Sequence, residues 1–233
     1  MILVGHQPEY LSYVGFFYKA AKADKFIFVD HVQFLKKSFQ NRNKIRIAPG
    51  SSGWTWLTVP IITKGKRFQK INEVEIDNSV RWGEKHWKTI YFNYKERPFF
   101  NDHKDFFENL YAKKWEMLAD LNEEIICYLF EKLGIGAPIY KSSDYNFNGA
   151  KTDLLIEMCD KLGADTYLSG VGAKTSGYVA EEEFKKHGLH HIFSDFEHPV
   201  YVQKFKPFIP GMSIIDFLFN CGAEQFKEMI KKR

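Results

Sequence analysis

Short apolar runs and helix-like segments alternate along the first 30 residues. Met1–Val4 is apolar and stops at a polar turn, Tyr10–Ala23 is helix-like and rich in aromatic side chains, and Lys25–Asp30 is a second apolar run. A strand, a turn, a helix and another strand form a βαβ unit with parallel strands. The beginning of the chain therefore predicts an α/β protein.

The middle of the chain changes character twice. Ile45–Ile47 and Trp54–Pro60 flank a turn that contains Pro and Gly, which predicts a β-hairpin, and Val74–Asp77 has the pattern of one more short strand. From residue 82 to residue 133 the apolar positions take helical spacing, and the last helix, Leu118–Leu133, ends at Gly134. We expect a helical subdomain over residues 82–133.

The last part of the chain returns to alternating helices and strands. Helices are predicted at Ala150–Leu162, Phe184–His187 and Ser213–Asn220, and strands at Ile139–Lys141, Asp165–Ser169 and Gly188–Phe193. The strand at 165–169 runs into a Gly-rich turn at 169–172. Taken together, the pattern predicts a single α/β domain over residues 1–233, with a Rossmann-like, mainly parallel sheet, a helical insertion and a β-hairpin.

Composition and charge narrow the function classes. Hydrophobic residues make up 45% of the chain and charged residues 27%, which is typical of a globular protein. The net charge is +4, from 33 Lys and Arg against 29 Asp and Glu, and so small an excess disfavours a nucleic-acid partner while it suits a phosphorylated small molecule. No run reaches 18 apolar residues, so no membrane span is expected.

The cysteines and the first residues indicate a cytoplasmic location. Cys127, Cys159 and Cys221 are far apart in apolar runs, and we expect reduced, buried thiols. Met1–Val4 is too short for the apolar part of a signal peptide. No set of His, Cys, Asp or Glu residues has the spacing of metal ligands, so no metal site is predicted.

Polar side chains follow the first two predicted strands. In open parallel sheets ligands bind outside the carboxyl ends of the strands, which here are Gly5-His6-Gln7 and Asp30-His31-Val32-Gln33. His6 is the candidate general base, and Asp30 and His31 are further catalytic candidates. Gln7 and Gln33 offer amide groups to a substrate. The alternative is a pair of solvated polar turns.

A basic segment lies between the second strand and the hairpin. Four cations and two amides fall within nine residues: Lys36, Lys37, Asn41, Arg42, Asn43 and Lys44. Ammonium and guanidinium groups suit a phosphate or diphosphate, and amides would fix its orientation. A solvated basic loop is the alternative.

Two weaker groups complete the candidate site. After the strand at 165–169, Ser169 and Gly170 offer backbone N–H groups to an anion, with Lys174 and Tyr178 nearby in sequence. This turn is neither a Walker A loop nor a G-x-G-x-x-G motif. His198 and Gln203 lie in a later polar segment that is explained equally well as a capped strand.

Several motifs occur in a fixed order along the chain. They are His6-Gln7-Pro8-x-Tyr10-Leu11, Asp30-x-Val32-Gln33-Phe34, Asn41-Arg42-Asn43, Trp56-Leu57-Thr58-Val59-Pro60, the run from Gly163 to Gly170, and the run from Ser213 to Gly222. From residue 1 to about 222 the chain resembles the WbqC-like family. One departure is Ser12, where the family usually has proline after Tyr-Leu, and we expect it to change only a turn.

The resemblance implies a role in bacterial surface-glycan biosynthesis, because the family takes its name from an O-antigen gene cluster. It implies a transferase that adds an N-acyl or aminoacyl group to a nucleotide-linked amino sugar. Coenzyme A or an acyl carrier protein is a candidate source of the thioester. In this reading His6 accepts the amine proton, the Lys36–Lys44 segment binds the diphosphate, Tyr10 or Trp56 stacks on a base or sugar, and backbone N–H groups near Gly170 hold the oxyanion.

Two other functions stay open at this stage. The order of strand, His-containing turn and helix is similar to the start of pantothenate synthetase-like proteins, which favours a nucleotidyltransferase or an adenylate-forming ligase. The second histidine of their H-x-G-H turn is absent, because Glu9 and Tyr10 stand where it would fall. A protein that binds a sugar nucleotide without catalysis is the non-enzymatic alternative.

Overall fold

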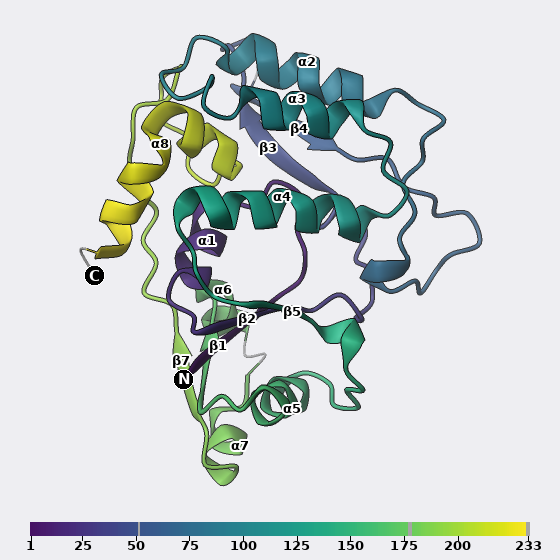
Figure 1. The fold of residues 1–233 in the computed structure, drawn as a ribbon, viewed down its shortest axis with the longest axis vertical. Coiled ribbons are helices and arrows are strands. Elements are labelled where there is room, and N and C mark those ends of the chain that lie inside the picture. Colours follow the sequence, from purple (N-terminus) through teal and green to yellow (C-terminus); the bar gives the residue numbers. More distant parts are fainter. Residues whose placement is uncertain (51, 177–178, 232–233) are drawn as a thin grey trace. The chain divides into compact units, whose positions relative to one another are not determined.

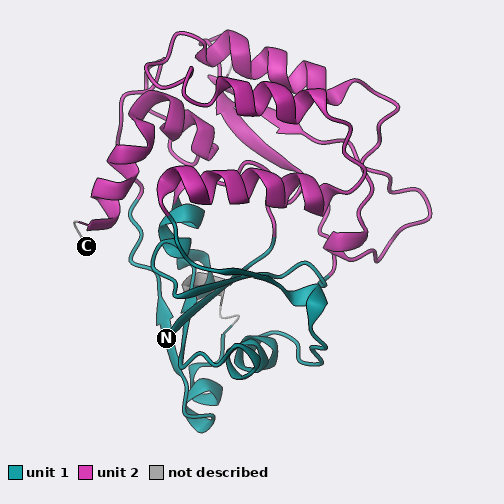
Figure 2. Ribbon diagram, in the orientation of Figure 1, with its two compact units in different colours: residues 1–7, 15–32, 135–197 teal, residues 8–14, 33–134, 198–233 magenta. Residues whose placement is uncertain are grey.

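The computed structural model describes residues 1–50, 52–176 and 179–231 (Figure 1). The chain forms two compact units, each assembled from three separate segments (Figure 2). Unit 1 comprises residues 1–7, 15–32 and 135–197, and unit 2 comprises residues 8–14, 33–134 and 198–233. Each unit therefore depends on residues that are far apart in the sequence.

Unit 1 is built on a parallel sheet of five strands. The strands are β1 (Ile2–His6), β2 (Lys25–Phe28), β5 (Ile139–Lys141), β6 (Thr166–Ser169) and β7 (His190–Phe193). Their order across the sheet is β5-β2-β1-β6-β7, and every neighbouring pair is parallel. This is the order of the first five strands in a Rossmann sheet. The predicted α/β class with a mainly parallel sheet is confirmed.

Helices cover both faces of this sheet (Figure 1). Leu3 and Ile27 point to one face, where they pack in a buried cluster with α5 (Thr152–Leu162) and with Phe184 of α7 (Glu181–Lys186). On the other face, Phe16 of α1 (Val14–Ala20) lies 5.7 Å from Phe26, between ring centroids. The alternation of strand side chains between the two faces explains why these strands are apolar throughout.

Unit 2 combines a hairpin with long helices. The strands β3 (Arg42–Arg46) and β4 (Trp54–Thr58) pair antiparallel, as the sequence predicts. The helices are α2 (Trp82–Tyr94), α3 (Lys104–Ala112), α4 (Leu118–Leu133) and α8 (Ile214–Lys231). The helical segment predicted at 82–133 thus consists of α2, α3 and α4, and α4 ends at Gly134 in the left-handed conformation (φ 72°).

A buried polar network ties unit 2 together. The Asp216 carboxylate of α8 accepts hydrogen bonds from Tyr94 Oη at 2.8 Å, Tyr201 Oη at 2.7 Å and Gln203 Nε2 at 2.8 Å. Arg46 is 1% exposed and donates to the carbonyl oxygens of Gly53, Phe205 and Pro207. The network therefore joins α2, α8, β3 and the segment that follows residue 198.

Several expectations from the sequence were wrong in detail. Val74–Asp77 is not a strand: a 3₁₀ turn, η1 (Ile71–Glu73), precedes it, and Glu75 and Ile76 form isolated bridges. Arg42 to Lys44 belong to β3 rather than to a loop. The Gly-rich turn is shorter than predicted, because α6 (Val171–Ser176) begins directly after Gly170. Of the three cysteines predicted to be buried, Cys159 is buried, Cys221 is half-buried, and Cys127 is exposed because it lies on the outer side of α4.

Candidate functional site

In open α/β sheets the ligand crevice lies outside the carboxyl ends of the two strands where the strand order reverses, and in unit 1 these strands are β1 and β6. From β1 the chain continues through α1 to β2 on one side, whereas from β6 it continues through α6 and α7 to β7 on the other side. The loops leave these neighbouring strands in opposite directions, and ligands of open α/β sheets bind at such a reversal. The residues at this point are His6 and Gln7 after β1, and Ser169 and Gly170 at the end of β6.

His6 is held in one orientation at the end of β1. Its Nδ1 lies 3.0 Å from the carbonyl oxygen of Gln7, which can only accept, so Nδ1 carries the proton and Nε2 is left as an acceptor. The ring meets Phe16 edge-on, with centroids 4.5 Å apart. Burial, with the nearby charge of Lys19, lowers the pKa of His6 to about 3. His6 is therefore neutral at physiological pH.

Lys19 is a buried cation at the same crevice. It lies on α1 and is 6% exposed, and its Nζ is 3.4 Å from the carbonyl oxygen of Gly5 in β1. The same Nζ is 4.0 Å from the position of a Cβ built on Gly170, at the end of β6. A lysine that approaches both strand ends gives the crevice positive potential, which suits an anionic group such as a phosphate.

The β6 side of the crevice is ordered by β7. Ser169 is 4% exposed, and its Oγ lies 2.7 Å from Nε2 of His191 on β7. Gly170 is half-buried, and the nearest described atom to a Cβ built on it is Lys19 Nζ, at 4.0 Å. Lys174 lies on α6, and Tyr178 falls outside the described residues.

Asp30 and His31 form a second polar group at the carboxyl edge of the sheet. Asp30 is 2% exposed and accepts hydrogen bonds from Ser142 Oγ at 2.8 Å, Ser143 N at 2.9 Å and Ser143 Oγ at 2.6 Å. Ser142 Oγ also lies 2.5 Å from Nδ1 of His31. Because the serine proton goes to Asp30, His31 donates to Ser142, and the carboxylate orients His31 through one serine.

The basic residues of the hairpin lie in unit 2. Arg42 and Lys44 lie on the same face of β3, over the Trp rings of β4. The Arg42 guanidinium is 4.2 Å from the Trp56 ring centroid, and Lys44 Nζ is 4.4 Å from the Trp54 ring centroid. Lys36 and Lys37 are exposed before the hairpin, and Gln33 is exposed and bridges to Lys70. The charges of Arg42 and Lys44 are therefore already engaged in cation–π contacts with tryptophan rings.

Other predicted ligand-binding residues of unit 2 hold backbone groups instead. Asn41 and Asn43 are buried, and their amides donate to the carbonyls of Val59 and of Tyr10 and Leu11. Gln203 Nε2 donates to Ile209 O and to Asp216, and its Oε1 accepts from Ile209 N. His198 is engaged by Pro199 O and Gly211 N. These side chains have few groups left for a ligand.

Tyr10 is fully buried, so it presents no ring face to a base or sugar. Its hydroxyl lies 2.5 Å from Tyr111 Oη and 2.9 Å from His86 Nδ1. His86 also bonds to the backbone carbonyl of Thr58, so its other nitrogen accepts from Tyr10. The result is a directed chain of hydrogen bonds from α3 to β4, and burial lowers the pKa of His86 to about 4.

The sequence analysis missed several residues that the structure brings to these groups. They are Lys19, Ser142, Ser143 and His191 in unit 1, and His86 and Tyr111 in unit 2. Ser142 and Ser143 directly follow the predicted strand Ile139–Lys141, so the rule that selected Asp30 also selects them. Lys19 is a lone cation in an apolar helix, which is a signal of a buried charge.

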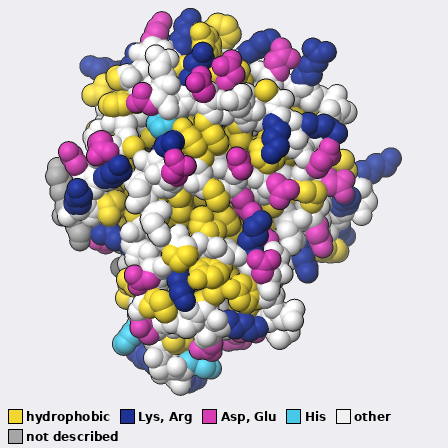
Figure 3. All heavy atoms as spheres, in the orientation of Figure 1, with side chains coloured by type: hydrophobic (Ala, Val, Ile, Leu, Met, Phe, Trp, Pro, Cys, Tyr) yellow, Lys and Arg dark blue, Asp and Glu magenta, His cyan; other side chains and the backbone are white. Residues whose placement is uncertain are grey.

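Among the described residues, no three His, Cys, Asp or Glu side chains gather in a way that could hold a metal ion. In the same part of the chain, no helix is long and apolar enough to cross a membrane. Figure 3 shows Lys and Arg interspersed with Asp and Glu on the face of each unit that is turned to the viewer.

The fold is that of an α/β protein whose parallel sheet reverses its strand order between β1 and β6. The family model described as the WbqC-like protein family matches residues 7–228. The chain belongs to the WbqC-like family. It is 34% identical over 220 residues to Rv1507c of Mycobacterium tuberculosis, covering 94% of this chain and 93% of that protein, whose name states no activity. No solved structure matches the chain.

Proposed function

We propose that the β1–β6 crevice binds a nucleotide-linked amino sugar and that the protein transfers an acyl or aminoacyl group to the sugar amine in surface-glycan biosynthesis. The observation that carries the proposal is the buried Lys19 ammonium at the strand-order reversal, beside His6 and Gly170. A buried cation near the carboxyl ends of both strands suits the diphosphate of a sugar nucleotide. Family membership supports the glycan context.

His6 has a defined role in this proposal. Its Nε2 is an acceptor in the crevice, so it accepts a hydrogen bond from the sugar amine. As the amine nitrogen attacks the thioester carbonyl, a C–N bond forms, the C–S bond breaks, and the proton lost from nitrogen passes through His6 to the leaving thiolate. With a pKa of about 3, His6 is a weak base in the free protein. A bound diphosphate adds negative charge that raises this pKa, so base strength depends on substrate.

The experiment is a binding and turnover assay with UDP- and dTDP-linked amino sugars. We expect binding of one such compound, and acyl transfer when an acyl thioester is added. His6→Ala should retain most of the binding and lose turnover by about 100-fold or more, as expected for the loss of a general base. Full turnover by His6→Ala would remove the base assignment. Binding without turnover of any donor would favour the non-catalytic alternative.

One observation favours a second candidate, a nucleotidyltransferase or adenylate-forming enzyme. A histidine that directly follows β1 of a sheet with this strand order, with a lysine on the first helix, could equally contact the phosphates of ATP. ATP consumption with release of pyrophosphate would identify that chemistry. Acyl transfer that needs no ATP would exclude it.

A further inference from the structure

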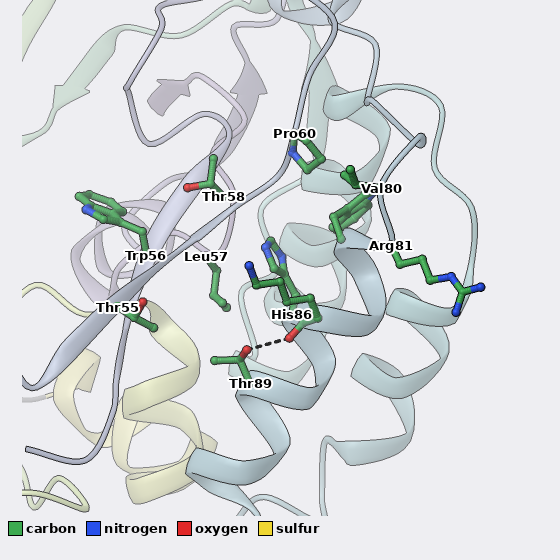
Figure 4. Close-up of a pocket in the computed structure, with 11 residues that line it drawn as sticks. Thr55, Trp56, Leu57, Thr58, Pro60, Val80, Arg81, His86 and Thr89 are labelled. Carbon is green, nitrogen blue, oxygen red and sulfur yellow. Dashed lines mark hydrogen bonds between the residues drawn. The ribbon is translucent and has the colours of Figure 1, made fainter. Parts of the chain in front are cut away.

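A groove of about 570 Å³ lies wholly within unit 2, between β4 and α2 (Figure 4). Leu57 and Pro60 line it from the hairpin side, and Val80 and Trp82 from the helix side. Its base contains His86, whose two ring nitrogens are already bonded to Tyr10 and to the Thr58 carbonyl. The groove therefore has a fixed, mostly apolar interior.

The rim of the groove includes the outer edge of β4. Val59 N donates to Asn41 O at 2.8 Å, and Ile47 N donates to Gly53 O at 3.1 Å. These two bonds fix which residue pairs of the hairpin are hydrogen-bonded and which are not. By that alternation the peptide groups of Trp56 point away from β3, on the same side as the Thr58 carbonyl that His86 contacts. Within the described residues β4 pairs only with β3, so this edge can pair with another extended chain.

Two exposed cations lie at the same groove: Arg81 directly precedes α2, and Lys85 is in its first turn. Arg81 and Lys85 both line it, and Figure 4 shows Arg81 at the end that holds Pro60 and Val80. Arg81 has only a long contact, 3.9 Å, with Glu84, which lies closer to Lys88 at 2.6 Å. The rim thus carries positive charge next to an edge strand and an apolar interior. This combination suits an extended, amide-bearing ligand with an anionic end.

We propose that this groove binds the phosphopantetheine arm of an acyl donor. The arm is an extended chain with two amides, an apolar dimethyl group and a terminal phosphate. Its amides pair with the outward N–H and C=O groups of Trp56, its apolar portion lies against Val80 and Pro60, and its phosphate is attracted by Lys85 and Arg81. The choice of an acyl donor rests on the proposed function, whereas the chemistry of the groove does not.

The test is calorimetric binding of defined probes to the full-length protein. Phosphopantetheine and coenzyme A should bind with similar affinity, pantetheine should bind more weakly because it lacks the phosphate, and adenosine 3′,5′-bisphosphate should not bind. Similar binding of the first two probes means that the arm is recognised in free coenzyme A and on a carrier protein alike. Tighter binding of an acylated carrier protein than of coenzyme A would identify the carrier protein as the source of the arm.

Variants separate the groove from other surfaces. Lys85→Glu should weaken binding of phosphopantetheine by about tenfold or more, because an attractive charge becomes repulsive. Lys95→Glu is the matched control, since Lys95 is exposed at the opposite end of the same helix and does not line the groove. Thr89→Trp should fill the groove and abolish binding, and a thermal melt would verify that this variant folds.

Three outcomes would overturn the proposal: no binding of phosphopantetheine or coenzyme A at millimolar concentration, binding of adenosine 3′,5′-bisphosphate as strong as that of coenzyme A, or unchanged binding in Lys85→Glu and Thr89→Trp. Binding of the nucleotide-linked sugar is measured in the same variants. If Thr89→Trp loses the arm and keeps the sugar nucleotide, the groove is the donor site. If the phosphopantetheine arm binds but the sugar nucleotide does not, the proposed function is contradicted, whereas the assignment of the groove is supported.

Discussion

At the scale of single residues, burial decides what the polar side chains of this protein can do. Lys19 is buried at the carboxyl end of β1 and contacts the Gly5 carbonyl oxygen, and His6 keeps Nε2 as an acceptor nitrogen because its Nδ1 donates to Gln7. Tyr10 and Asn43 have the residue types of ligand-binding groups, yet both are buried and bonded to protein atoms. The residue type alone does not distinguish these two situations.

Lys19→Met tests the role of the buried cation. The substitution keeps the apolar stem and removes the charge, so we expect binding of the nucleotide-linked sugar to weaken by about tenfold to a hundredfold, the value of a charge-assisted hydrogen bond. It should also raise the pKa of His6, which the Lys19 charge lowers, and an NMR titration of the His6 ring would follow this. Lys22→Met, at the same end of α1, is the control. An unchanged His6 pKa would contradict the placement of Lys19.

Ser142→Ala tests the link between Asp30 and His31. Removing the hydroxyl breaks the Asp30–Ser142–His31 connection while Ser143 still contacts the carboxylate. If His31 takes part in catalysis, kcat should fall about tenfold to a hundredfold with little change in KM, because an orienting group acts through its partner. Ser143→Ala should have a smaller effect. Equal losses in the two variants would mean that the serines only support Asp30.

At the scale of helices and strands, local pattern and long-range packing contribute differently. Leu118–Leu133 with Gly134 and Ile139–Lys141 were predicted with their observed bounds, because amphipathic spacing and a glycine stop are local features. Tyr10–Ala23 was too long as a helix, since α1 begins at Val14 and Tyr10 is bonded to α2 and α3. Which loops lie at the strand-order reversal depends on the order of strands across the sheet, which no local pattern reveals.

Asp216→Ala tests the polar network that joins the elements of unit 2. The change leaves two tyrosine hydroxyls and the Gln203 amide without their shared acceptor, inside a buried region. We expect a loss of about 3–5 kcal/mol in the free energy of unfolding, because several buried hydrogen-bond donors lose their acceptor at once. Asp216→Asn keeps one acceptor oxygen and should cost less. Urea denaturation of both variants measures the two losses in stability. A smaller loss in Asp216→Ala than in Asp216→Asn would contradict the account.

At the scale of the whole molecule, buried histidines set the response to acid. His86 has a folded pKa of about 4, below its value of 6.5 in the unfolded chain, so its stabilisation is complete above pH 6.5 and is lost as pH falls toward 4. The loss is roughly 3 kcal/mol by pH 4. Asp216 acts in the opposite sense, because burial raises its pKa in the folded protein and its contribution declines as pH rises through that value.

Urea denaturation at several pH values tests this linkage. His86→Gln should reduce the dependence of stability on pH between 4 and 6.5 without abolishing it, since one group that takes up a proton on unfolding is gone while His6, with a folded pKa of about 3, remains. His187→Gln, at an exposed position of α7's C-terminal end, is the control and should leave the slope unchanged. A slope that stays the same in His86→Gln would show that other groups govern the acid response.

The most direct test of the central claim is calorimetric titration of UDP- and dTDP-linked amino sugars into wild type, Gly170→Val and Gly136→Val. Neither glycine has a positive φ, and a Cβ at either meets nothing closer than 4.0 Å, so both variants should fold. The account predicts that wild type and Gly136→Val bind within about twofold of each other, as expected for a surface change. Gly170→Val, which fills the β1–β6 crevice, should bind about a hundredfold more weakly. Equal binding by all three proteins would show that the sugar nucleotide does not occupy this crevice.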